Sequence, residues 1–142
     1  MQVFIVGSIY NTVVVLDRKR RHKQWVEIQQ IIAAINGKKA WGNHPCTIQY
    51  KEYKYWLLLY RTVIEFINMD MHSSAKNISQ KAEKFKPKWH CEEYFNQMKK
   101  RLYTKDKEHY KCFESYGESN CNWYWSQEEN KFIKYIDGKR IE

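Results

Sequence analysis

The sequence predicts a mainly α, compact single-domain fold with a small β-hairpin at its C-terminal end. The 142 residues include only two prolines and five glycines, so few residues interrupt helices. Apolar side chains recur at helical spacing across residues 11–114. Residues 120–140 instead alternate aromatic and polar side chains, as strands do. A chain of this length, 43% hydrophobic, can bury a substantial core within one domain.

Residues 1–10 are expected to form an extended arm. Residues 2–6 (QVFIV) are apolar and β-prone, and Gly7 and Ser8 follow them, so we expect the arm to be buried against the domain. Asn11 is a candidate N-cap for a brief helix that continues through Val13–Val15.

A long amphipathic helix is predicted from Leu16 to Gly37, with Asp17 as its N-cap and Gly37 as its end. An apolar stripe should face the core, formed by Trp25, Ile28, Ile31, Ile32 and Ile35. A second face carries residues at positions i, i+3, i+4 and i+7, namely Arg20, Lys23, Gln24 and Glu27. A single acid among cations suits an enzyme that acts on a nucleic-acid backbone. The alternative is a solvated Lys23–Glu27 pair that contributes only ~0.3–0.5 kcal/mol.

Three further helices are expected between residues 45 and 84. Residues 38–46 (KKAWGNHPC) form a loop, and Pro45 begins a helix. An amphipathic helix follows over residues 50–66. Residues 68–77 are the most loop-like, with Ser73 or Ser74 capping a short helix towards Lys84.

The remaining chain is expected to contain an extended crossing, two helices and the hairpin. Pro87 favours extended backbone over residues 85–90. Residues 91–103 form the next helix, and Thr104 or Asp106 opens a last short helix over residues 107–113. The turn signal Asp137–Gly138 marks a hairpin within residues 122–139.

The net charge of +9 indicates a polyanionic partner. Nucleic acid is the first candidate, with an anionic membrane surface, a phosphate-rich ligand and an indifferent basic surface as alternatives. Three basic clusters carry much of this charge: Arg18, Lys19, Arg20, Arg21 and Lys23; Lys81, Lys84, Lys86 and Lys88; and Lys99, Lys100, Arg101, Lys105 and Lys107. Each alone is often a solvated face, but three together favour phosphate contacts.

Aromatic side chains lie among these clusters, and exposed rings can stack on bases or insert into a duplex. Trp41 is the candidate for that role, whereas core packing is the preferred interpretation for Trp25 and Trp89. His44 is either a capping or core histidine or a contact to phosphate or base.

The spacing of cysteines and histidines indicates no metal site, and we expect neither a metal nor a cofactor. We expect reduced thiols. No signal peptide is recognised at residues 1–10, and the apolar run Trp56–Tyr60 is too short to span a bilayer. These observations predict a soluble, cytoplasmic protein that associates with the nucleoid. If the protein is viral, we expect it in the cytoplasm of the host cell.

Several motifs, in order along most of the chain, resemble the pyrimidine-dimer DNA glycosylase family of the endonuclease V type. They are LDRKRRHKQWVEIQQI (16–31), WGNHP (41–45), the Tyr- and Leu-rich helix, RLYTKDKEHYKCF (101–113) and NWYW (122–125). The resemblance implies a compact helical fold, double-stranded DNA with damaged or modified pyrimidines as partner, and N-glycosylase activity coupled to abasic-site lyase cleavage without a metal.

The resemblance also implies roles for individual residues. Glu27 takes the place of the catalytic glutamate, and an N-terminal α-amine acts as nucleophile. Gln2 is too bulky for routine removal of the initiator methionine, so the amine is that of Met1, with Lys23 as the second candidate. By the resemblance, Arg20, Arg21, Lys23 and His44 contact the DNA backbone. Further candidates for binding nucleic acid are Gln24 and, in and after the helix expected over residues 91–103, Lys100, Arg101 and Lys105.

Two other functions use the same features. A non-catalytic protein could bind or sequester nucleic acid or a nucleotide on this fold, needing the basic and aromatic surface but not Glu27. A structural, nucleic-acid-associated protein would need only the charge.

Overall fold

The computed structural model describes residues 2–38, 40–118, 121–126, 128–129 and 131–141. The chain divides into two compact units, residues 1–88 and 89–142, and each is described by itself. The first contains helices α1 (Ile9–Val15), α2 (Arg18–Ile35), α3 (Pro45–Tyr50), α4 (Lys54–Asn68) and α5 (His72–Ala82). The second contains α6 (Glu92–Lys105), the 3-10 helix η1 (Lys111–Tyr116) and strands β1 (Cys121–Ser126), β2 (Lys131–Ile136) and β3 (Lys139–Ile141). The mainly helical fold with a C-terminal antiparallel hairpin is therefore confirmed. The single-domain organisation stays a prediction.

The N-terminal arm is extended and buried, as expected. Val3, Phe4 and Ile5 are each at most 7% exposed. The Phe4 carbonyl accepts a hydrogen bond of 2.6 Å from the Tyr60 hydroxyl, and the Val6 amide donates to the Thr12 hydroxyl at 3.0 Å. Because an extended segment makes no backbone bonds within itself, these side chains satisfy buried backbone groups that would otherwise destabilise the fold.

Helix α1 begins at Ile9, three residues earlier than a cap at Asn11 would place it. Ser8 is the N-cap, and its hydroxyl accepts from the Asn11 amide at 3.1 Å. Asn11 therefore occupies the third helical position, and the prediction that it caps the helix is wrong. Burial of Ile9, Thr12 and Val13 stabilises this short β-branched helix through packing rather than propensity.

Helix α2 has the bounds and the core face expected of it. Asp17 is the N-cap, although its carboxylate makes no capping hydrogen bond. Ile28, Ile31 and Ile32 are buried, while Trp25 and Ile35 at the edges of the stripe are half-buried. Gly37 adopts a φ of 101°, the left-handed conformation that ends helices and that favours glycine.

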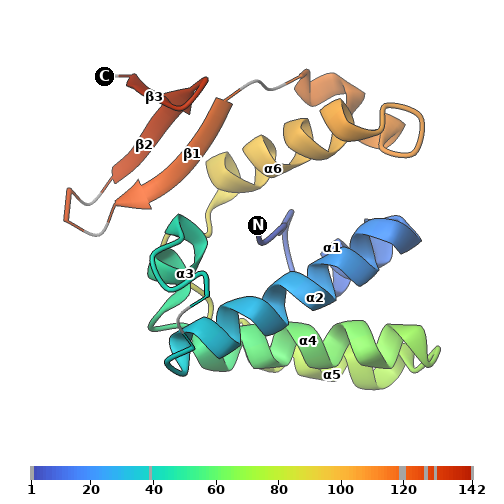
Figure 1. Ribbon diagram of the computed structural model, residues 1–142. Coiled ribbons are helices and arrows are strands. Elements are labelled where there is room, and N and C mark those ends of the chain that lie inside the picture. Colours follow the sequence, from blue (N-terminus) through green and yellow to red (C-terminus); the bar gives the residue numbers. More distant parts are fainter. Residues whose placement is uncertain (1, 39, 119–120, 127, 130, 142) are drawn as a thin grey trace. The chain divides into compact units, whose positions relative to one another are not determined.

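Helix α4 contributes more buried apolar residues than any other helix of the first unit and lies beside α2 and α5 (Figure 1). Its buried residues are Trp56, Leu57, Leu59, Tyr60, Val63, Ile64 and Ile67. Helix α5 starts at His72, so the loop expected over residues 68–77 is shorter than predicted and neither Ser73 nor Ser74 is a cap. Ala75, Ser79 and Ala82 are buried. The packing of this small-residue face against α4 and α1 outweighs the weak helix propensity of the segment.

The second unit differs from expectation at its last helix. Helix α6 runs to Lys105 and includes Thr104, so Thr104 opens no helix. Asp106 does accept a hydrogen bond of 3.1 Å from the His109 amide, but only a turn follows, and the regular element is η1 over Lys111–Tyr116. Tyr94, Met98, Leu102, Tyr110 and Phe113 are buried in this unit.

The three strands form one antiparallel sheet in the order β1-β2-β3. Asp137 and Gly138 have φ values of 50° and 77°, which is the turn chemistry that connects two adjacent strands tightly. The third strand, β3, was not predicted, since three residues are too few to show an alternating pattern. Among the described residues, no helix combines the length and hydropathy needed to cross a bilayer.

Replacing Tyr60 by Phe should destabilise the first unit, because the change leaves the buried Phe4 carbonyl without its donor while preserving the ring. We expect the free energy of unfolding in urea to fall by about 1–3 kcal/mol. Tyr55→Phe is the matched control, because Tyr55 is exposed on the same helix, and should change stability little. Equal losses in the two variants would contradict the importance of this hydrogen bond.

Candidate active site

The carboxylate of Glu27 contacts the N-terminal arm. Its Oε2 accepts a hydrogen bond of 2.9 Å from the Gln2 backbone amide, in a partly buried position. Glu27 therefore lies where the chain begins, although the two residues are 25 positions apart. Met1, predicted as the nucleophile, lies outside the described residues.

Gln24, one turn before Glu27 on the same face of α2, fixes the arm by both ends of its amide. Its Oε1 accepts from the Phe4 amide at 2.7 Å, and its Nε2 donates to the Gln2 carbonyl at 2.9 Å. The side chain is 1% exposed. The predicted contact of Gln24 with nucleic acid does not fit this placement, because the arm covers the side chain and uses both of its polar atoms.

His44 and Trp41 lie together in the loop before α3. His44 is the N-cap of that helix, and its Nδ1 accepts from the Cys46 amide at 3.1 Å. The Trp41 ring meets the imidazole edge-on, with 5.7 Å between centroids, and remains 49% exposed. Trp41 also has a φ of 65°, which is rare for a bulky residue and costs free energy. An exposed indole on strained backbone beside a capping histidine is suited to contact a ligand.

The electrostatic surroundings of His44 connect it with Glu27. Burial lowers the pKa of His44, the positive charge of the N-terminus lowers it further, and the Glu27 carboxylate acts in the opposite direction. The Glu27 carboxylate is thus part of the electrostatic environment of His44. A neutral imidazole is also what the cap requires, because protonated Nδ1 cannot accept from Cys46.

The predicted cations of α2 lie in two different places. Lys23 is exposed one turn before Glu27, and Arg20 lies 3.9 Å from Asp17 across the first turn. Arg21 belongs to another face: its guanidinium donates to the carbonyls of Val13 and Leu16 at the end of α1. Lys23 and Arg20 therefore share the side of Glu27, and Arg21 does not.

The other predicted cations belong to the second unit. Lys100 and Arg101 are half-exposed in the last turns of α6, and Lys105 is exposed at its end. All three lie within two turns of one helix and add positive charge to that unit. Their role in binding nucleic acid stays a prediction.

Two residues that hold the arm were absent from the expected site. Tyr60 and Thr12 reach the arm from α4 and α1 through their hydroxyl groups. No local signal marks them, because a tyrosine or threonine in an apolar stripe has the pattern of a core residue. Within the described part of the chain, no group of three or more His, Cys, Asp or Glu side chains is arranged to hold a metal ion.

Comparison with protein families gives a match to pyrimidine dimer DNA glycosylase over residues 1–64. The match confirms the resemblance for the arm, α1, α2, α3 and most of α4. It supports a role of the pyrimidine-dimer glycosylase type and DNA as the substrate. No curated protein and no solved structure matches the chain.

The lowered pKa of His44 makes stability depend on pH. The pKa of His44 is lower in the folded chain than the ordinary value of 6.5, which applies to the unfolded chain. At mildly acidic pH, His44 therefore takes up a proton when the chain unfolds. The free energy of unfolding should therefore fall as the pH drops through 6.5 towards the lower folded value. His44→Asn keeps a capping acceptor without a titrating group.

Urea unfolding of both proteins at about pH 7.5 and about pH 5.5 measures this effect. The wild type should lose more stability than His44→Asn over that interval, since the other titrating groups are common to both. An identical loss would show that His44 does not titrate differently in the two states.

Proposed function

We propose that this protein is a DNA N-glycosylase with abasic-site lyase activity on damaged or modified pyrimidines. The observation that carries the proposal is the 2.9 Å hydrogen bond between the Gln2 amide and Glu27, in a segment that matches the family. Covalent geometry keeps the α-nitrogen of Met1 within a few ångströms of the Gln2 amide. The α-amine of Met1 and the Glu27 carboxylate are therefore both tied to the Gln2 amide, so they can act on the same substrate atom.

The α-amine is suited to act as nucleophile near neutral pH. Its reference pKa is about 7.7–8.0 against about 10.4 for a lysine side chain, so a larger fraction is unprotonated. The nitrogen attacks C1′ of the damaged nucleotide, and the bond between C1′ and the base breaks with its electron pair leaving on the base, which takes up a proton. The nitrogen then loses one proton, and the C1′–O4′ bond of the sugar breaks with its electron pair leaving on O4′, which takes up a proton. The product is a protonated Schiff base (an iminium) at C1′.

Strand cleavage follows from the Schiff base. A proton leaves C2′, the electrons shift towards the iminium, and the 3′-phosphate departs by β-elimination. Water then hydrolyses the C1′–nitrogen bond and regenerates the amine. Every atom comes from the enzyme, the nucleotide or water, and the carbon that is attacked carries positive charge as its base departs.

Glu27 has two tasks in this scheme. Its carboxylate stabilises the positive charge that develops on the sugar, and it can take up and return the protons of the amine and of C2′. Its hydrogen bond to Gln2 also positions the first residues of the chain. Gln24, buried under the arm, is a positioning residue in this proposal rather than a contact to DNA.

Binding of DNA uses solvent-accessible groups around this region. Lys23 and Arg20 face phosphates, His44 contacts the backbone, and the exposed Trp41 ring stacks on or separates bases next to the lesion. A lesion lowers the cost of unstacking and so favours damaged sites. The net charge of +9 supplies affinity that does not depend on sequence.

Borohydride trapping tests the chemistry directly, because reduction of a Schiff base joins enzyme and DNA covalently. The wild type should form a trapped adduct with an abasic or dimer-bearing duplex, and Glu27→Gln should reduce strand cleavage by at least about a hundredfold. Glu52→Gln, an exposed change of the same chemistry, is the control and should leave cleavage unchanged. Mass spectrometry of the digested adduct should locate the link on the α-amine of Met1 rather than on Lys23.

Two outcomes would contradict the proposal. Absence of any adduct, with tight binding that does not depend on a lesion, would favour the non-catalytic binding protein. Cleavage by Glu27→Gln at the wild-type rate would remove the carboxylate from the mechanism. The scheme requires a free α-amine on Met1, and intact mass with N-terminal analysis should show one.

The salt dependence of binding tests the placement of Lys23. The logarithm of affinity for a lesion-bearing duplex should fall linearly with the logarithm of salt concentration, and Lys23→Gln should reduce the slope by about 0.9 for the lost phosphate contact. Lys51→Gln, an exposed lysine elsewhere in the same unit, is the matched control. Equal slopes for the wild type and Lys23→Gln would remove Lys23 from the interface.

A further inference from the structure

A second face of α2 lines a cavity on the side of the helix that does not carry Glu27. Arg18, Arg21, His22 and Trp25 stand at positions i, i+3, i+4 and i+7, so they share one face, as the residues around Glu27 share another. This face lies opposite the C-terminal end of α4. Neither the family match nor the proposed chemistry assigns it a task.

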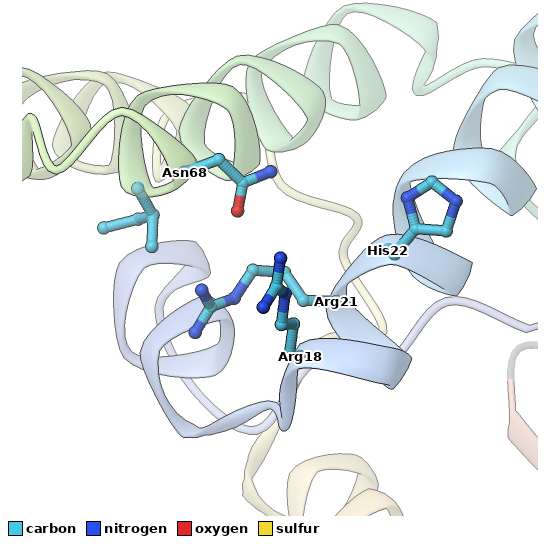
Figure 2. A pocket seen from close by; sticks show the side chains of 5 residues that line it. Arg18, Arg21, His22 and Asn68 are labelled. Carbon is cyan, nitrogen blue, oxygen red and sulfur yellow. The ribbon is translucent and has the colours of Figure 1, made fainter.

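The cavity has a volume of about 610 Å³ and is lined by Arg18, Arg21, His22, Ile67 and Asn68. Figure 2 shows the guanidinium of Arg18 and the amide of Asn68 pointing towards each other from α2 and α4. Its size lies within the range of small-molecule sites. No acidic residue is among those that line it, so an anion entering it meets two positive charges and no negative one.

The two arginines are arranged differently. Arg21 is held in place, since its Nε donates to the Val13 carbonyl at 3.2 Å and one terminal nitrogen donates to Leu16 at 3.4 Å. The side chains of Arg18 and Asn68 make no hydrogen bond or ion pair within the described residues. A fixed guanidinium beside an available one offers the planar donor geometry that binds phosphate oxygens.

An aromatic hollow continues from the cationic cavity. It has a volume of about 510 Å³ and is lined by Trp25, Glu65 and Met69, together with the His22 and Asn68 that it shares with the first. The rings of His22 and Trp25 are stacked, with centroids 6.3 Å apart and planes inclined by 17°. The Trp25 indole donates to a Glu65 carboxylate oxygen at 3.1 Å, which fixes the ring in this orientation.

We propose that these two connected hollows bind one nucleoside monophosphate unit. The phosphate lies between Arg18 and Arg21, and the base packs on the Trp25 ring, where Glu65 and Asn68 offer an acceptor and an amide for its polar edge. Phosphate alone would use only the first hollow, and an uncharged aromatic molecule only the second. The combination of a cationic and an aromatic end favours a ligand that has both.

The same chemistry occurs in a free mononucleotide and in a nucleotide of a single strand, and both fit the site as described. This site is independent of the proposed glycosylase reaction, since it uses none of Glu27, Gln24 or the arm. Arg21, expected to contact the DNA backbone beside Glu27, contacts a phosphate here instead.

Isothermal titration calorimetry tests the proposal with thymidine 5′-monophosphate, thymidine, inorganic phosphate and a short oligothymidylate. The monophosphate should bind more tightly than thymidine or phosphate. Arg18→Gln should weaken its binding roughly tenfold, the effect of losing a charge-assisted hydrogen bond. Lys19→Gln, the same charge change on the adjacent exposed residue outside the cavity, should have much less effect.

Trp25→Leu separates the two ends of the site. It should weaken binding of the monophosphate roughly fivefold, the effect of one lost stacking contact, and leave binding of inorganic phosphate unchanged. If the natural ligand is a free mononucleotide, thymidine 5′-monophosphate should bind as tightly as the oligothymidylate. If the ligand is a single strand, the oligothymidylate should bind more tightly than the monophosphate, and Arg18→Gln and Trp25→Leu should weaken its binding by the same factors as they weaken that of the monophosphate.

Glu27→Gln keeps this test apart from the glycosylase proposal, because that variant should bind the monophosphate as the wild type does whatever its effect on cleavage. The inference is overturned by equal weakening in Arg18→Gln and Lys19→Gln, which would indicate a diffuse charge effect. It is overturned equally by thymidine 5′-monophosphate binding no more tightly than inorganic phosphate, or by Trp25→Leu leaving its affinity unchanged.

Discussion

The buried amide of Gln24 is the interaction on which the first unit depends. Residues 2–7 of the arm make no backbone hydrogen bonds with one another, and Val3, Phe4 and Ile5 are buried, so their backbone groups need partners away from water. Gln24 supplies a donor to Gln2 and an acceptor for Phe4, and Tyr60 supplies a donor from the other side. A buried amide with both ends satisfied allows few alternative positions, because any shift of the arm leaves polar atoms unpaired. The site around Glu27 is therefore built by the packing of the arm.

Helix α2 organises two surfaces through one repeat. The residues at i, i+3, i+4 and i+7 from Arg20 lie on the side of the arm, and those at the same spacing from Arg18 lie on the side of the end of α4. The second set begins two positions earlier in the sequence than the first. Two positions along an α-helix bring a side chain to nearly the opposite side. The crowded run of positive charge at the start of α2 is thus divided between two faces, which reduces repulsion among its members and gives each face its own cations.

The sequence predicted the helices better than it predicted the contacts between them. Gly37, Pro45 and the stripe of α2 carry local signals, and these elements are where the signals place them. Gln24 was predicted to contact DNA because it shares a helix face with Arg20, Lys23 and Glu27. Position on a helix face does not reveal that another segment, here the arm, covers the side chain. The start of α5 was missed because its small buried residues owe their helix to packing. The arrangement of Trp25, Glu65 and Asn68 depends on contacts between α2 and α4, which no local pattern encodes.

The bond between Glu27 and Gln2 has an evolutionary consequence. A side chain that holds the Gln2 amide, and that in the proposed mechanism also stabilises charge on the substrate, would be retained under two separate pressures. A descendant that abandoned catalysis would still benefit from an acceptor at this position, because the Gln2 amide donates to it. In such a lineage, the nucleophilic amine would be lost first, through blocking or extension of the N-terminus, while the glutamate would be kept for its structural role.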